Sequence, residues 1–335
     1  MKINTTVHSV QQSLKNLTNP PVKLTHVYEL LAAAFGYNSY ASLKRVAILT
    51  NFDDPTAANQ DSILKRASSL GYQTFPSREL ATILEDEGLG ELTFYELAMK
   101  LREGDHFIQD DLDQLIAAEK NAWANYCLAL HYSEEDDETQ VGSEYWHNQM
   151  LAGRSLSGHE KKFALEYKKQ QEKANKYVLY LRKAASMGCE LALLDLAEKF
   201  DDAAFFESNH QNMVTDPMRI AQIAQNLGRI KDQHYWLTAA AEAGNTEAMR
   251  ELIEDFDSID LTRCWTWIYL SQLLGDDLTE DRHYAIHENG AIYDDDVGGP
   301  MYADGIEGIN IEPLEKQQDE LAKLAADALF SQIKK

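Results

Sequence analysis

The chain has 335 residues, of which 44% are hydrophobic and 26% charged, and its formal net charge is −24. This composition is typical of a folded protein rather than a disordered one, and the length allows two or three ordinary domains or one solenoid with an extra module. The strong negative charge disfavours non-specific binding to phosphate backbones. No apolar run approaches the ~20 residues that cross a bilayer, and the N-terminus lacks a signal-peptide pattern, so we expect a cytoplasmic protein without a membrane partner.

Three cysteines lie far apart in the sequence, at Cys127, Cys189 and Cys264. A secreted chain of this size would be expected to carry cysteines in a regular, paired pattern. Each of the three falls in a helical pattern, where a thiol acts as a small apolar side chain. We therefore expect a reducing compartment.

The first fifty residues are predicted to form a module of three helices. Apolar residues recur at helical spacing before Pro20, and a second helix over about 24–35 ends at Gly36, which tolerates the left-handed cap conformation. A third helix is expected to carry Leu43 and Val46. Residues 1–50 therefore form the first predicted domain.

The same module is basic and offers a candidate nucleic-acid surface. Lys44 and Arg45 fall on the predicted third helix, and Gly36 lies in the turn before it, as in a helix-turn-helix. The acidic remainder of the chain would repel phosphate. Contact with DNA or RNA through Lys44 and Arg45 is therefore the alternative hypothesis for function.

Residues 51–116 are predicted to form a second helical segment. Three short helices, over about 56–70, 77–87 and 92–103, are separated by glycines that interrupt the helical period. We expect this segment to pack against the first module and to precede the repeats.

One sequence pattern occurs twice. Lys183–Phe200 reads KAASMGCELALLDLAEKF, and Ala239–Phe256 reads AAAEAGNTEAMRELIEDF. A looser copy lies at Ala117–Tyr132, and half a copy at Trp267–Gly275. Because each copy of such a repeat buries its apolar face against a neighbour, residues 117–287 are predicted to form an all-α superhelix, a solenoid of helix pairs.

The aligned positions indicate how the predicted helix pairs pack. Paired alanines let two helix backbones approach closely, a glycine ends the first helix, and a third alanine opens the second helix against the first. A large aromatic residue fills the space between pairs. The residues that define the repeat are Tyr180, Ala184, Ala185, Gly188, Ala192, Trp236, Ala240, Ala241, Gly244, Ala248, Trp267 and Gly275.

The blocks Tyr180–Leu196 and Trp236–Ala248 resemble the Sel-one-like repeat, a relative of the tetratricopeptide repeat. The resemblance implies a right-handed superhelix that acts as an adaptor or scaffold for a protein or peptide partner, with no catalytic residues and no cofactor. The chain departs from the family pattern in its irregular spacing and in Lys120, which stands where a glycine is expected. The resemblance covers roughly residues 117–287.

Residues 24–46 are similar to a short helical module found in many bacterial proteins of unassigned role, some of them labelled glyoxalase-related. The motif begins HVYELLAAAFGYNSYASL at His26. This similarity indicates a bacterial origin rather than an activity.

The C-terminal part, residues 288–335, is expected to be a loop rich in glycine and aspartate followed by a helix over about 313–333. The loop lacks a helical period and is long enough to be a feature of its own. The helix is predicted to cap the last repeat, because the end of a solenoid must present a polar face to water.

Two patterns near this loop resemble metal sites in part. His283 and His287 are four residues apart and would share one helix face, but Tyr284 stands where a metalloprotease has its glutamate, so we expect a helix surface. Asp294–Asp296 with Gly299 resembles a calcium loop, but Gly305 stands where the glutamate ligand belongs, so we expect a solvated acidic loop.

No catalytic set emerges, and an enzyme has the least support, with the loop 288–308 as its only plausible place. A basic stretch, residues 159–187, is predicted to be a long helix. Trp265 is expected to face outward as a partner-binding anchor, whereas the other repeat tryptophans should be core. The leading hypothesis is a non-catalytic protein–protein interaction adaptor.

Overall fold

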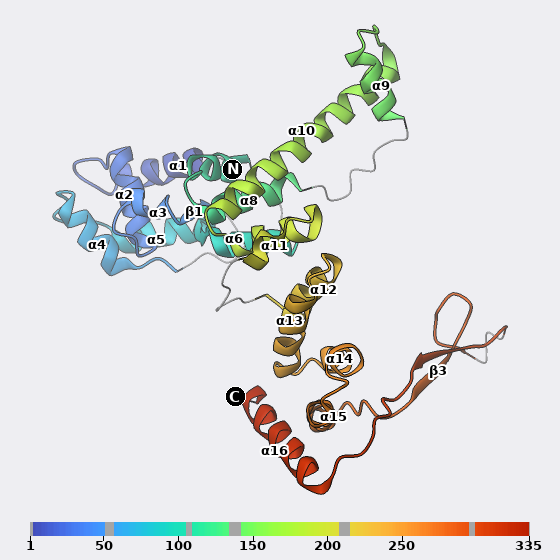
Figure 1. Cartoon of the computed structure of the whole chain (residues 1–335). Coiled ribbons are helices and arrows are strands. Elements are labelled where there is room, and N and C mark those ends of the chain that lie inside the picture. Colours follow the sequence, from blue (N-terminus) through green and yellow to red (C-terminus); the bar gives the residue numbers. More distant parts are fainter. Residues whose placement is uncertain are drawn as a thin grey trace. The chain divides into compact units, whose positions relative to one another are not determined.

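The computed structural model describes residues 3–50, 57–104, 109–133, 142–207, 215–294 and 299–334. Helices make up 64% of the structure, and the described strands form two sheets of two strands each. The prediction of a mainly helical protein is therefore confirmed. The chain divides into two compact units, Met1–Leu196 (unit 1) and Ala197–Lys335 (unit 2) (Figure 1).

The N-terminal part of unit 1 contains the predicted helices and also a small sheet. Strands β1 and β2 run antiparallel, with Ala47 opposite Thr93 and Thr50 opposite Gly90. All four residues of β1 are buried, so this strand lies inside the core. The elements are α1 (Ile3–Lys15), α2 (Leu24–Ala34), α3 (Tyr40–Leu43), β1 (Ala47–Thr50), α4 (Gln60–Ser69), α5 (Ser77–Asp86), β2 (Gly90–Thr93) and α6 (Phe94–Arg102).

The predicted apolar stripe of α1 is confirmed. Val7, Val10 and Leu14 are fully buried, and they belong to one hydrophobic cluster with Leu30 and Leu31 of α2. The spacing of the three α1 residues places them on one side of the helix, which is the side that faces the core.

The predicted third helix is shorter than expected. Helix α3 covers only Tyr40–Leu43, and the side chain of Ser39 caps its N-terminus. Lys44 and Arg45 lie in the turn that follows. The prediction that these two residues lie on a helix is therefore wrong, because the chain from Ala47 onward pairs with β2 instead of continuing the helix.

The rest of unit 1 is built around a long helix, α10. It packs against α8 near its C-terminal end and against α9 as well. The prediction of a long helix over the basic stretch is confirmed. The elements are α7 (Gln109–Ala117), α8 (Ala122–Tyr132), α9 (Ser143–Leu151), α10 (Gly158–Ser186) and α11 (Glu190–Phe200), the last of which begins in unit 1.

A buried polar contact joins three helices of unit 1. The Tyr126 hydroxyl of α8 donates to Asp195 Oδ2 of α11 at 2.6 Å, and Arg102 of α6 bonds to the Tyr126 hydroxyl and to Asp195 Oδ1 at 3.3 Å. Burial, together with the carboxylate, raises the pKa of Tyr126 far above its usual value, so the phenol stays protonated and keeps donating. Burying these polar side chains without hydrogen-bond partners would lower the stability of the fold. The three groups therefore fix the relative placement of their helices.

Unit 2 consists of helices and one β-hairpin. Helix α13 packs against α12 and α14, and α15 packs against α14 and α16. The elements are η1 (Ala203–Glu207), α12 (Pro217–Asn226), α13 (Ile230–Glu242), α14 (Thr246–Glu251), the π-helical turn η2 (Leu252–Phe256), α15 (Leu261–Leu274), β3 (Arg282–Ile286), β4 (Tyr302–Ile306) and α16 (Lys316–Ile333).

The repeat glycines occupy equivalent places. Gly244 follows α13 with a φ of 99°. Its N–H donates to Ala241 O, and the N–H of Asn245 donates to Ala240 O, both at 3.0 Å. Gly188 and Gly275 follow α10 and α15 with a φ of 88° each. This pair of hydrogen bonds satisfies carbonyls at a helix end and requires a left-handed residue, which explains the glycine.

The other repeat residues are mainly in the cores. Tyr180 and Ala185 are half-buried, whereas the remaining repeat alanines and both aligned tryptophans are buried; these are Ala184, Ala192, Ala240, Ala241, Ala248, Trp236 and Trp267. The two sequence copies thus share the glycine turn and the buried alanines on either side of it, whereas their second helices differ, since α11 is a regular helix and α14 continues into the π-helical turn η2.

Candidate interaction surface

The part of unit 2 that differs most from the sequence-based prediction is the antiparallel pair of strands β3 (Arg282–Ile286) and β4 (Tyr302–Ile306), called here the ribbon. Arg282 of β3 lies opposite Ile306 of β4, and Ile286 lies opposite Tyr302. The ribbon extends away from the helices of unit 2 (Figure 1). The predictions of repeats reaching residue 287 and of an irregular loop over 288–308 are thus wrong in part, because β3 and β4 occupy these segments.

One face of the ribbon carries large apolar side chains. Side chains alternate between the faces of a strand, so Tyr284, Ile286, Tyr302 and Ile306 lie on the same face, together with Asp304 and with Arg282, which lies opposite Ile306. Tyr284, Tyr302 and Ile306 are 53%, 46% and 54% exposed. Apolar side chains grouped on an exposed strand face are typical of interaction sites.

The opposite face of the ribbon is formed by small residues and one histidine. His283 lies opposite Gly305, and Ala285 lies opposite Ala303. Within the paired strands, the large apolar side chains therefore lie on the first face.

Arg250 of α14 fixes the base of the ribbon. Its guanidinium donates to Leu278 O at 3.3 Å, before β3, and to Glu307 O at 3.1 Å, after β4. It also pairs with Glu254 Oε1 at 2.9 Å. One side chain thus holds both ends of the ribbon to a helix, which matters because an isolated two-stranded hairpin is only marginally stable in water.

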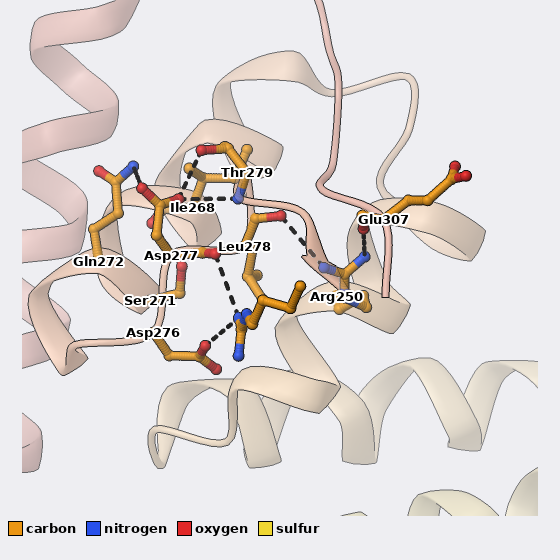
Figure 2. Close-up of polar contacts among 10 residues, drawn as sticks. Arg250, Ile268, Ser271, Gln272, Asp276, Asp277, Leu278, Thr279 and Glu307 are labelled. Atoms are coloured by element: carbon orange, nitrogen blue, oxygen red, sulfur yellow. Dashed lines mark hydrogen bonds and ion pairs between the residues drawn. The ribbon is translucent and has the colours of Figure 1, made fainter. Parts of the chain in front are cut away.

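A second set of contacts surrounds Asp277 at the same base (Figure 2). Asp277 Oδ1 accepts from the Thr279 N–H at 2.9 Å and from the Thr279 hydroxyl at 2.7 Å, and Oδ2 accepts from Gln272 of α15 at 3.1 Å. Arg282 pairs with Asp276 and donates to Asp277 O at 3.3 Å. Burial favours a higher pKa for Asp277, but these hydrogen bonds and the Arg282 charge outweigh it and lower the pKa.

Two glycines are required where the backbones meet. A Cβ on Gly305, whose φ is 142°, would lie 1.9 Å from Arg282 O, and a Cβ on Gly308 would lie 2.2 Å from Thr279 O. Both clashes are with backbone, which cannot move away as a flexible side chain would. The ribbon and its base therefore depend on glycine at these positions.

The ribbon lies in the most acidic part of the chain. Residues 276–315 include twelve aspartates and glutamates and a single arginine, Arg282. Arg282 already pairs with Asp276 at the base. The segment as a whole is therefore strongly negative, and it would attract a positively charged partner.

None of the predicted partner-binding residues belongs to the ribbon. Lys44 and Arg45 are exposed in unit 1, where the Lys44 ammonium lies 5.7 Å from the centre of the Tyr40 ring. Trp265 of α15 is half-buried, and its Nε1 donates to Glu312 O at 2.8 Å, in the segment that leads to α16. A role for these three residues in binding stays a prediction.

The predicted helix face with His283 and His287 is wrong. His283 lies in β3 and His287 directly follows it, where its Nε2 accepts from the Asp294 N–H at 3.1 Å. Asp295 and Asp296 of the calcium-loop pattern lie outside the described residues. Within the described ranges, no group of three histidine, cysteine or acidic side chains is arranged to hold a metal ion.

A hollow of about 410 Å³ beside η2 was a second candidate site. It is lined by Phe256, Asp257 and Ile259 among others. The Asp257 carboxylate is only 6% exposed, and it accepts from Trp267 Nε1 at 3.0 Å and pairs with Arg263 at 2.8 Å. Its charge therefore serves the packing of α15 rather than a ligand.

The ribbon was not predicted from the sequence. A strand signal does exist in Tyr302–Ile306, where large residues alternate with small or polar ones. The comparisons with known proteins add no guide, since no family model, curated protein or solved structure matches the chain. None of the helices in the described ranges combines the length and the apolar character needed to cross a membrane.

Proposed function

We propose that the chain is a non-catalytic protein–protein interaction adaptor or scaffold, built on Sel-one-like helix pairs that stack as a solenoid. The observation that carries this proposal is the ribbon, which presents an apolar face to solvent and is held at both ends by Arg250. Exposed tyrosine and isoleucine side chains suit contact with another protein, because aromatic and apolar side chains are concentrated in the buried cores of protein interfaces.

The repeat residues support the part of the proposal that concerns the stacked helix pairs. Gly188 and Gly244 end their helices in the same left-handed conformation, and the alanines aligned with them are buried or half-buried. Small residues at equivalent places allow close approach of neighbouring helices, as a stack of helix pairs requires. A body of this kind offers a rigid support for the ribbon.

The polar side chains at the base of the ribbon fit the same proposal. Arg250, Asp277 and Arg282 bond to backbone groups or to one another, so they hold the chain in place. Their contacts are those of a structural network rather than of groups that await a substrate.

The alternative is a regulator whose N-terminal module binds nucleic acid while the repeats recruit a protein. The exposure of Lys44 and Arg45 favours it, but α3 has only four residues, which is one turn of helix. A gel-shift series across salt concentrations tests it with Lys44→Ala and Arg45→Ala. Binding that is absent at low salt, or that both variants leave unchanged, rejects this alternative.

The adaptor proposal is tested by photo-crosslinking in the source cells. A benzophenone amino acid is placed at Tyr302 on the ribbon and, in a second variant, at Tyr235, which is 64% exposed on α13. The proposal predicts a discrete adduct with another protein from at least one position. That protein, once purified, should bind the full chain at a fixed stoichiometry in calorimetry.

A control variant shows whether an adduct depends on the folded ribbon. Gly305→Ala should abolish the adduct at Tyr302 and leave one at Tyr235 intact, because Gly305 is needed only within the ribbon. The absence of a discrete adduct from both positions would contradict the adaptor function.

A further inference from the structure

The outer strand of the ribbon is open to pairing. Among the described residues, β4 pairs with β3 alone, so its other edge has no strand beside it. All five residues of β4 are exposed. An open edge of this kind accepts an extended segment of another chain, which adds as a further strand through main-chain hydrogen bonds.

Asp304 lies at the centre of the open strand and is the one charged residue in it. Tyr302 and Ile306, two positions to either side, share its face, and Tyr284 lies opposite it on β3. Its Oδ1 accepts from the Gly305 N–H at 2.8 Å, and Asp304 forms no ion pair with a described residue. An exposed carboxylate with aromatic neighbours is a suitable partner for a lysine or arginine, because tyrosine rings also attract cations.

The charge of the residues around Asp304 also favours a basic partner. Besides Asp304, residues 276–315 include eleven acidic residues against one arginine, Arg282, which shares the face of Asp304 but is paired with Asp276. This excess of negative charge repels acidic segments and nucleic acid and attracts basic segments. Opposite charges that lie directly across from each other on neighbouring strands stabilise the pairing. Charge complementarity therefore identifies the occupant of the edge as a basic segment of a protein.

We propose that β4 binds an extended segment of a partner protein that carries a lysine or arginine opposite Asp304 and apolar residues two positions to either side of it. The apolar residues would lie opposite Tyr302 and Ile306. This pattern reads the same in both directions, so it applies to parallel and antiparallel addition alike. The inference rests on the proposed adaptor function and names the kind of segment that the adaptor takes.

The test uses the full chain and three labelled peptides. The first has the sequence Ser-Thr-Val-Thr-Lys-Thr-Val-Thr-Ser, and in the others glutamate or serine replaces the lysine. Fluorescence anisotropy at low salt should give an affinity about tenfold higher for the lysine peptide than for the glutamate peptide, and added salt should reduce the difference. The amide signals of Ala303 and Gly305 should shift on binding in NMR spectra.

Matched variants separate recognition from a general charge effect. Asp304→Asn should remove the preference for lysine, whereas Asp327→Asn, an equal change of charge on the exposed side of α16, should keep it. Tyr302→Ser should weaken binding of the lysine and serine peptides alike. Gly305→Ala should abolish binding of all three, because the strand itself is disturbed.

The outcomes that would overturn the inference are distinct from those for the adaptor function. Equal affinity for the three peptides, or a lysine preference that Asp304→Asn leaves intact, rejects recognition by Asp304. If no peptide binds although the Tyr302 adduct forms in cells, strand addition is wrong and the adaptor function stands. An adduct of Tyr302 with a second copy of the chain, together with dimers in ultracentrifugation, assigns the edge to self-association and also overturns the inference.

Discussion

The helix pair α13–α14 and the ribbon are neighbours in unit 2, yet they are stabilised in different ways. The helix pair buries Ala240, Ala241 and Ala248 and is closed by the turn at Gly244. The ribbon exposes its large side chains and depends on polar contacts at its base, above all those of Arg250. Apolar burial thus stabilises the body, whereas hydrogen bonds to a few backbone groups stabilise the projecting element.

This difference has a consequence for function. The apolar side chains that a helix pair buries are not available to a partner, whereas a hairpin held only at its base keeps a whole face and an edge available. Changes in the body should therefore affect stability more than binding, and changes in the ribbon should do the reverse.

The largest loss of stability is expected from Trp267→Ala in the helices of unit 2. Trp267 is 3% exposed, and its Nε1 donates to Asp257 at 3.0 Å. Removal of a buried tryptophan costs about 3–5 kcal/mol, so the unfolding transition of unit 2 should fall strongly in chemical denaturation. Trp265→Ala is the matched control, since its ring is only half-buried, and a loss as large as that of Trp267→Ala would contradict the comparison.

A smaller and local effect is expected from Gly305→Ala in the ribbon. The added Cβ would lie 1.9 Å from Arg282 O, and the residue would keep an unfavourable φ of 142°. Backbone strain of this kind costs on the order of 1–3 kcal/mol, and only the ribbon should open. Amide exchange should rise in β3 and β4 and stay unchanged in α13. An equal rise in α13 would show that ribbon and body unfold together.

A modest effect is expected from Asp277→Asn at the base. Loss of the carboxylate should weaken the contact with Gln272 and cost about 0.5–1.5 kcal/mol of local stability. Because folding lowers the pKa of Asp277, its contribution should be complete above the usual carboxyl pKa and be lost as the pH falls through the lower folded value. The amide signal of Thr279 in NMR follows this acid transition.

The matching variant shows whether this acid transition belongs to Asp277. In Asp277→Asn the Thr279 signal should no longer report it, because the side chain no longer titrates. A transition of unchanged midpoint in the variant would assign it to another acid of the segment.

The smallest effect on stability is expected from Tyr302→Ser on the apolar face. The Tyr302 side chain is 46% exposed, and substitutions at such surface sites are usually within about 0.5 kcal/mol of neutral. Thermal unfolding should hardly change, whereas peptide binding should weaken. A loss of stability as large as that of Gly305→Ala would mean that the tyrosine supports the ribbon itself.

The sequence alone determined most of the helices and their buried residues. Val7, Val10 and Leu14 recur at the helical period, and the glycine that follows α13 marks the end of that helix, because both signals act over a few neighbouring residues. Local periodicity and local caps are sufficient for such elements.

Tertiary structure decided the elements whose partners are distant in sequence. Residues 47–50 became a strand because Gly90–Thr93 pairs with them, and the chain after Tyr302 became one because Arg282–Ile286 lies beside it. Nothing in the sequence around Arg250 indicates that its side chain contacts Leu278 and Glu307. Strand pairing and side-chain contacts with distant carbonyls depend on which segments folding brings together, and the local pattern of residues does not contain that information.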